Sequence, residues 1–132
     1  MTNPVRACWL ILTAVLATGC ASSQHAGKHM QASESGSRVI VPVELDDYVI
    51  RMPSSIAPGD VTLQVKNVGH HAHNIKISGQ GVKSQLPKNL QSGESADLEL
   101  RLEAGTYKVT CPVGPHALMG MRMTLTVEQR KS

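Results

Sequence analysis

From residue 39 onward, hydrophobic and polar positions alternate along the chain with a period of two. The apolar members of the clearest runs are Val39, Val41, Val43 and Leu45; Tyr48, Ile50 and Met52; Val61, Leu63 and Val65; and Leu98, Leu100 and Leu102. Successive side chains of a β-strand point to opposite faces, so this pattern predicts strands with one buried and one exposed face. No stretch keeps the period of an amphipathic helix.

Turn-forming sequences separate these runs. They are Ala57-Pro58-Gly59-Asp60, Lys66-Asn67-Val68-Gly69, Ser92-Gly93-Glu94 and Glu103-Ala104-Gly105. Short strands divided by such turns predict an all-β fold, an antiparallel Greek-key sandwich or barrel of about seven to eight strands. Residues 79–92 show no clear pattern and are expected to form a loop or a short helix.

Residues 1–19 resemble the signal peptide of bacterial lipoproteins. Arg6 precedes an apolar run over residues 7–17, which is shorter than the roughly 20 residues a membrane span needs. Ala17-Thr18-Gly19-Cys20 is similar to the lipobox, although Leu16 stands four residues before the cysteine, where the family usually has Leu three before it. The resemblance implies lipidation of Cys20; the alternative is an ordinary signal peptide that leaves Cys20 as a spare thiol.

Residues 20–37 carry the lipidated cysteine and a linker rich in Ser, Ala, Gln and Gly, which predicts a flexible tether. His25, His29 and Met30 could bind stray copper or simply be solvated. The folded domain is expected over residues 38–132. The protein would thus be exported and anchored by lipid to the cell envelope, on the periplasmic side of the outer membrane in a Gram-negative host, because Ala21 permits that sorting.

The composition limits the function. A chain of 132 residues has room for one ordinary domain, and its formal charge of +3 is scattered rather than clustered. With one Trp, two Tyr and no Phe, it lacks the stacking surfaces of a nucleic-acid-binding protein. Six His, three Cys and six Met make it rich in soft metal ligands instead.

Three potential ligands fall on the same side of the alternation as the apolar residues of their own predicted strands. These are His73, Cys111 and Met121, and the alternation predicts that each points inward. His116 lies in residues 112–120, a loop between the last two strands that two prolines and a glycine stiffen.

This donor set favours one metal chemistry. Two imidazoles, a thiolate and a weak thioether match a mononuclear copper site that cycles between Cu(I) and Cu(II). Zinc is more often held by four strong donors, so the thioether argues against it. Cys111 is the single cysteine of the expected domain, which excludes an iron–sulfur cluster and a two-cysteine copper centre.

Over Arg38 to Gln129 the sequence resembles the cupredoxin family. The shared motifs are Asn67-Val68-Gly69 followed by His73-Asn74, and Gly105-Thr106-Tyr107 leading into Cys111-Pro-Val-Gly-Pro-His116-Ala-Leu-Met-Gly-Met121. Four residues separate Cys111 from His116 and four separate His116 from Met121, a spacing similar to that of rusticyanin-type members.

The resemblance implies a role for each of these side chains. His73, Cys111 and His116 would be the strong ligands of one type 1 copper, and Met121 the axial ligand. Met119 is the alternative axial ligand, although it follows His116 more closely than the family allows. Asn74 would hydrogen-bond across to the loop that bears Cys111.

Residues around the expected site suggest how it meets other molecules. His70 and His71 are either exposed loop residues or a second, weaker copper site. An apolar collar around His116 would dock redox partners such as a cytochrome or a copper protein, and we expect a monomer. The collar comprises Val113, Pro115, Ala117, Leu118 and Met119.

The sequence therefore favours a one-electron carrier that is not an enzyme. A periplasmic copper chaperone or storage module is the alternative, because His70, His71, Met119 and Met123 surround the site. Copper enzymes need further centres and more histidine ligands than this domain offers. A metal-free immunoglobulin-like module would leave the convergence of ligands unexplained.

Overall fold

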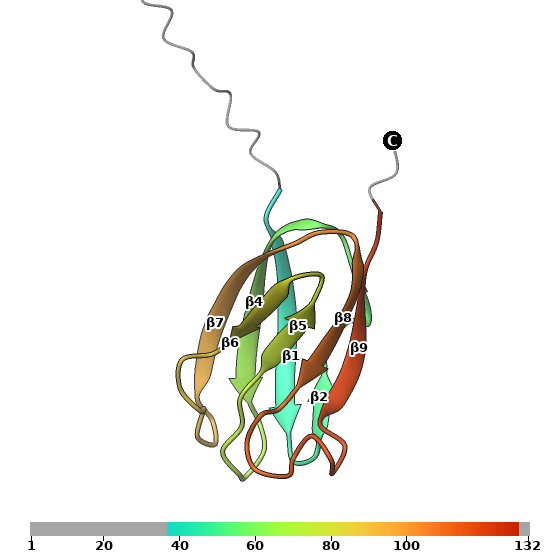
Figure 1. Cartoon of the computed structure of the whole chain (residues 1–132). Coiled ribbons are helices and arrows are strands. Elements are labelled where there is room, and N and C mark those ends of the chain that lie inside the picture. Colours follow the sequence, from blue (N-terminus) through green and yellow to red (C-terminus); the bar gives the residue numbers. More distant parts are fainter. Residues whose placement is uncertain (1–36, 130–132) are drawn as a thin grey trace, which may run out of the picture. The chain divides into compact units, whose positions relative to one another are not determined.

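A computed structural model describes residues 37–129 (Figure 1), which form nine β-strands and no helix. The strands are β1 (Val39–Asp46), β2 (Val49–Arg51), β3 (Ser55–Ile56), β4 (Gly59–Asn67), β5 (Lys76–Gly79), β6 (Val82–Gln85), β7 (Ser95–Leu102), β8 (Gly105–Thr110) and β9 (Arg122–Val127). Within this range there is no helix long and apolar enough to cross a membrane. The expected signal peptide, Cys20 and almost all of the linker lie outside the described residues.

The strands form two sheets, which confirms the predicted all-β sandwich. One sheet has the order β2-β1-β4-β7 and the other the order β3-β9-β8-β5-β6. Most neighbours are antiparallel, but β1 runs parallel to β4 and β3 runs parallel to β9, so both sheets are mixed.

The inward faces of the two sheets enclose the core. Alternate residues of the central strands are buried, and apolar burial supplies most of the driving force for folding. The fully or nearly fully buried members include Val41, Val43, Leu45, Leu63, Ile75, Ile77, Leu102, Tyr107, Val109 and Leu125. Tyr107 is buried, and its hydroxyl donates to the Glu103 carbonyl at 2.9 Å.

Residues 79–92 were expected to form a loop or a short helix, and this is wrong for residues 82–85, which form strand β6. β5 and β6 form a hairpin that turns through residues 79–81, where Gln80 and Gly81 have positive φ. β6 is a four-residue edge strand whose side chains are all at least partly exposed, so its sequence carries no hydrophobic alternation. The following loop places Leu86 and Leu90 in the core.

Three connections that surround the candidate ligands gather at one end of the sandwich. They are the β1–β2 turn, the β4–β5 loop and the β8–β9 loop, whereas the described chain begins and ends at the opposite end (Figure 1). The parallel pairing of β1 with β4 brings the first two of these connections together, because both strands finish at the same edge.

Candidate metal centre

His73 lies in the β4–β5 loop and is held by its backbone. Its N–H donates to the Leu90 carbonyl at 3.0 Å, and the Leu90 N–H donates back at 2.8 Å. The buried Asn67 amide secures the same loop, donating to the carbonyls of His71 and Leu90 and accepting from the Gly69 N–H. The backbone at His73 is therefore held from both sides.

Cys111 and Met121 stand at the two ends of the β8–β9 loop. The Cys111 N–H donates to the Met121 carbonyl at 3.0 Å, and the Met121 N–H donates to the His116 carbonyl at 3.0 Å. These bonds close the loop on itself and bring His116 back over Cys111. The side chains of His73, Cys111 and Met121 are all fully buried, so the inward orientation predicted from strand parity is confirmed.

Three donor atoms converge at this end of the sandwich. The Cys111 Sγ lies 3.9 Å from His73 Nδ1 and 3.7 Å from His116 Nδ1, and the two nitrogens are 3.2 Å apart. A metal held at about 2.0 Å by nitrogen and about 2.3 Å by sulfur at trigonal angles would place the nitrogens about 3.5 Å apart and each about 3.7 Å from the sulfur. The three side chains thus match the outline of a trigonal metal site.

The two methionines of the loop differ in position. Met121 is fully buried beside Cys111 and His116 in the backbone network, whereas the side chain of Met119 is 49% exposed. Met119 belongs to a turn whose N–H groups bond back to Pro115 and His116. Of the two thioethers, Met121 is the one whose burial suits an axial ligand.

The mouth of the site is lined by aromatic rings. His116 is half-buried and meets Tyr48 edge to face at a centroid distance of 6.0 Å. Burial, and then the proximity of His73 and His71, lower the pKa of His116 below its ordinary value. A neutral imidazole is the form that binds a metal.

Tyr48 does not belong to a strand as its alternation predicted. It lies in the β1–β2 turn with a φ of 67°, and its carbonyl is 2.7 Å from where a Cβ on Gly120 would stand. Gly120 itself has a φ of 127°, a region that other residues rarely adopt. The turn and the β8–β9 loop therefore fit together only because Gly120 has no side chain.

Asp47, in the same turn, is a functional residue that the sequence reading missed. Its Oδ1 lies 3.2 Å from His73 Nε2, on the side of the ring opposite Nδ1. Its two oxygens also accept from the N–H groups of His70 and His71 and face both of their Nδ1 atoms. A hydrogen bond from Nε2–H to this carboxylate leaves the lone pair of His73 on Nδ1, where the cluster needs it.

These contacts also keep Asp47 ionised. Partial burial opposes ionisation, but the hydrogen bonds from His71, His70 and His73 outweigh it and hold the pKa of Asp47 well below its ordinary value. The approach is so close that a Cβ on Gly69 would lie 2.6 Å from Asp47 Oδ1 and 3.0 Å from His73 Nε2. Gly69, which belongs to a predicted turn and to a motif shared with the cupredoxin family, thus makes room for this carboxylate.

Asn74 makes a different connection from the one the resemblance implied. Its amide nitrogen lies 3.0 Å from Asn89 Oδ1 and within hydrogen-bonding distance of the carbonyls of Leu86 and Lys88. Because His73 points to the cluster, its neighbour Asn74 points away from it, toward the segment after β6. It secures the backbone next to His73 and is not joined by a hydrogen bond to the loop that bears Cys111.

His70 and His71 stay outside the cluster. Both rings are well exposed and face Asp47 at 3.2 and 3.0 Å. Among the described residues, the one convergence of three or more His, Cys or carboxylate ligands is that of His73, Cys111 and His116. The arrangement matches the expectation that His70 and His71 are exposed loop residues, and the structure adds that both contact Asp47.

A buried thiol and two imidazoles on a rigid β-sandwich, beside a buried thioether, define the class of mononuclear copper proteins with a single cysteine ligand. Residues 52–128 match the family model described as copper binding proteins of the plastocyanin/azurin family, so this chain belongs to that family. Its cofactor is copper. No curated protein gives a significant match.

Several solved structures share the fold. Auracyanin from Roseiflexus castenholzii superposes with a TM-score of 0.60 at 17% identity, over 69% of this chain and 98% of its own. Auracyanin B superposes with a TM-score of 0.59 at 23% identity, over 70% of this chain and 90% of its own. Reduced rusticyanin superposes with a TM-score of 0.59 at 20% identity, over 71% of this chain and 81% of its own. At these identities the likeness establishes the fold alone.

Proposed function

We propose that the protein is a one-electron carrier whose copper is bound by His73, Cys111 and His116, with Met121 as the axial ligand. The convergence of the first three donor atoms within 4.8 Å of one another carries the proposal. Soft sulfur ligands suit Cu(I) and imidazoles suit Cu(II), so one donor set serves both oxidation states. When bound, copper supplies the one-electron change.

The protein contributes rigidity. His73 is fixed by Leu90 on its backbone and by Asp47 on its ring, and the Cys111 loop is closed by its own hydrogen bonds. Side chains held in this way move little when the charge at the centre changes. This favours electron transfer and is at odds with a role in releasing the metal.

Partners are proposed to dock at the His116 end of the sandwich. Leu118 is 81% exposed and Met119 49% exposed beside the half-buried His116 ring. An apolar patch of this kind is typical of a protein interaction site. We propose a cytochrome or a copper protein as the partner, with the carrier itself a monomer and not an enzyme.

The location follows from the N-terminal sequence. Export, cleavage before Cys20 and lipidation would leave the domain on a linker at the cell envelope. The described chain begins at the end of the sandwich opposite the β8–β9 loop (Figure 1), so the proposed tether is attached away from the proposed docking end.

Copper retention distinguishes a carrier from a copper chaperone. The copper-loaded protein is reduced with ascorbate in the presence of a Cu(I) chelator and then reoxidised with ferricyanide. A carrier keeps its metal through the cycle, and its visible absorption returns in full. Transfer of most of the copper to the chelator within the time of mixing would favour the chaperone instead.

Replacing Met121 with leucine should leave copper bound and raise the reduction potential, because a weak electron donor to Cu(II) is lost. Met119→Leu is the matched control and should leave the potential within a few millivolts of the wild type. Protein-film voltammetry measures both. The assignment of the axial ligand is wrong if the two variants exchange behaviours.

A further inference from the structure

The outward face of the larger sheet is uniformly basic. The side chains that project from it on β5, β6, β8 and β9 include four cations, which are Lys76, Lys83, Lys108 and Arg122. These four strands contain no carboxylate, and within residues 37–129 none of the four cations makes an ion pair. We call these four residues the basic face.

Strand register places these cations close together. Thr110 pairs with Arg122 on one side and with Lys76 on the other, and Ser78 pairs with Lys108 and Lys83. Following the alternation of β9 past its last residue, the next outward-facing carboxylate is that of Glu128. It accepts a hydrogen bond from the Ser55 hydroxyl. No two of the four cations stand directly opposite each other, so the register groups them on one face without a like-charge pair across neighbouring strands.

The outward face of the other sheet carries more acidic than basic side chains. Its outward side chains on β1, β2, β4 and β7 include five carboxylates and three cations, which are Glu44, Asp46, Asp60, Asp97 and Glu99 with Arg51, Lys66 and Arg101. Two of these cations are paired, Arg51 with Asp46 and Arg101 with Asp60. The described domain is therefore electrically polarised, although the formal charge of the chain is only +3.

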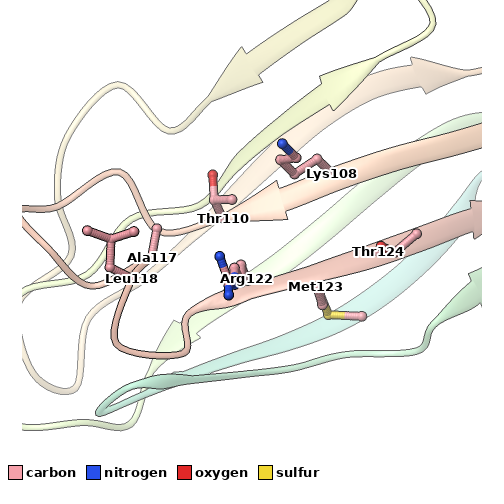
Figure 2. Close-up of a pocket in the computed structure, with 7 residues that line it drawn as sticks. All are labelled: Lys108, Thr110, Ala117, Leu118, Arg122, Met123 and Thr124. Atoms are coloured by element: carbon pink, nitrogen blue, oxygen red, sulfur yellow. The ribbon is translucent and has the colours of Figure 1, made fainter.

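The basic face borders the metal centre. Alternation turns Cys111 and Met121 inward and so turns their neighbours Thr110 and Arg122 outward. An open hollow of about 480 Å³ lies between residues of β8 and β9 and two residues of the β8–β9 loop, Ala117 and Leu118, which follow His116 in the sequence (Figure 2). Its lining residues are Lys108, Thr110, Ala117, Leu118, Arg122, Met123 and Thr124.

From this geometry we infer that the basic face, together with Leu118, is the docking surface for an acidic redox protein. The inference rests on the proposed electron-carrier function and specifies the chemistry of the partner. Carboxylates of the partner would meet Lys108 and Arg122, while an apolar side chain would lie against Leu118 at the rim of the hollow. Unpaired cations raise the rate of encounter with such a partner more than they raise its affinity.

The test compares two charge reversals, one on the outward face of each sheet. Lys108→Glu alters the basic face, and Lys66→Glu makes the same change of charge on β4 in the other sheet. Both side chains are exposed, and neither makes an ion pair in the described residues. Stopped-flow absorbance follows reduction of each copper-loaded protein by two haem proteins, the acidic cytochrome b5 and the basic cytochrome c.

With cytochrome b5 at low salt, Lys108→Glu should lower the second-order rate constant at least about threefold, and Lys66→Glu should change it far less. Added salt should slow the wild type and remove the difference. Equal effects of the two reversals, or faster reaction of the wild type with cytochrome c as salt is lowered, would overturn the inference.

Two further outcomes are informative. Anionic lipid vesicles that bind the wild type but not Lys108→Glu, with unchanged cytochrome b5 kinetics, would assign the basic face to a membrane surface and overturn the inference. Failure of both haem proteins to reduce a copper-loaded wild type would contradict the proposed function itself. Unchanged visible spectra and thermal unfolding of both variants confirm that only the surface has been altered.

Discussion

Replacing Cys111 with serine is expected to abolish the intense blue or green absorption of the copper-loaded protein. The absorption arises from charge transfer between the thiolate and Cu(II), and within residues 37–129 Cys111 is the one cysteine that lies with His73 and His116. Serine fills nearly the same volume, so the fold should persist. The thiolate is also the softest ligand of the set, and its loss should weaken Cu(I) binding more than Cu(II) binding.

The visible spectrum after addition of one equivalent of Cu(II) measures the first effect. We expect the band of the variant to fall below about a tenth of its wild-type intensity. Cys20→Ser, prepared in parallel, is the matched control and should leave the band unchanged, because Cys20 is not part of the proposed site. A Cys111→Ser protein that remained blue would remove the basis of the ligand assignment.

Replacing Asp47 with asparagine is expected to weaken Cu(II) binding by about 10- to 100-fold and to raise the reduction potential. The carboxylate accepts from His73 Nε2–H, and its negative charge makes Nδ1 a stronger donor to the more highly charged Cu(II). The amide of asparagine is nearly isosteric and can still accept, but it carries no charge. Competition with a Cu(II) chelator gives the affinity, and voltammetry gives the potential.

Asp46→Asn is the control for this variant. Asp46 is the adjacent residue, and its replacement by asparagine removes the same charge. Its carboxylate pairs with Arg51 at 2.7 Å and not with a histidine. Its replacement should leave the potential almost unchanged. If the two variants shift the potential equally, Asp47 acts through its general charge and not through the His73 ring.

The sequence predicted the part of the site that follows from strand alternation. His73, Cys111 and Met121 lie on or next to strands whose apolar neighbours report which face is buried, and all three are buried in the structure. The ends of such strands meet at one edge of a sandwich. Alternation together with the family resemblance was therefore enough to name the residues that converge, including His116 in the intervening loop.

Asp47 could not be predicted in this way. Its position depends on the parallel pairing of β1 with β4, which brings the β1–β2 turn beside the β4–β5 loop. Pairing between strands that are not adjacent in sequence leaves no local signal, and an aspartate in a turn is common for other reasons. Gly69 was the one local sign, because a glycine makes room for a close approach, but it does not identify the group that approaches.

The connection made by Asn74 shows the same limit. Strand parity correctly sets it on the opposite side from His73, yet the partner on that side is the segment around Leu86 and Asn89. That segment had no recognisable pattern, because β6 is a short edge strand with no buried side chain. A hydrogen bond to an element that the sequence does not reveal cannot be derived from the sequence.

Titration of the metal-free protein with Cu(II), followed by visible absorption, tests the central claim most directly. If His73, Cys111, His116 and Met121 form one copper site, a strong thiolate band will rise linearly and stop at one copper per chain. It will disappear on reduction and return on oxidation. A protein that takes up copper without colour, or whose colour continues to rise well beyond one equivalent, would contradict a single site built on Cys111.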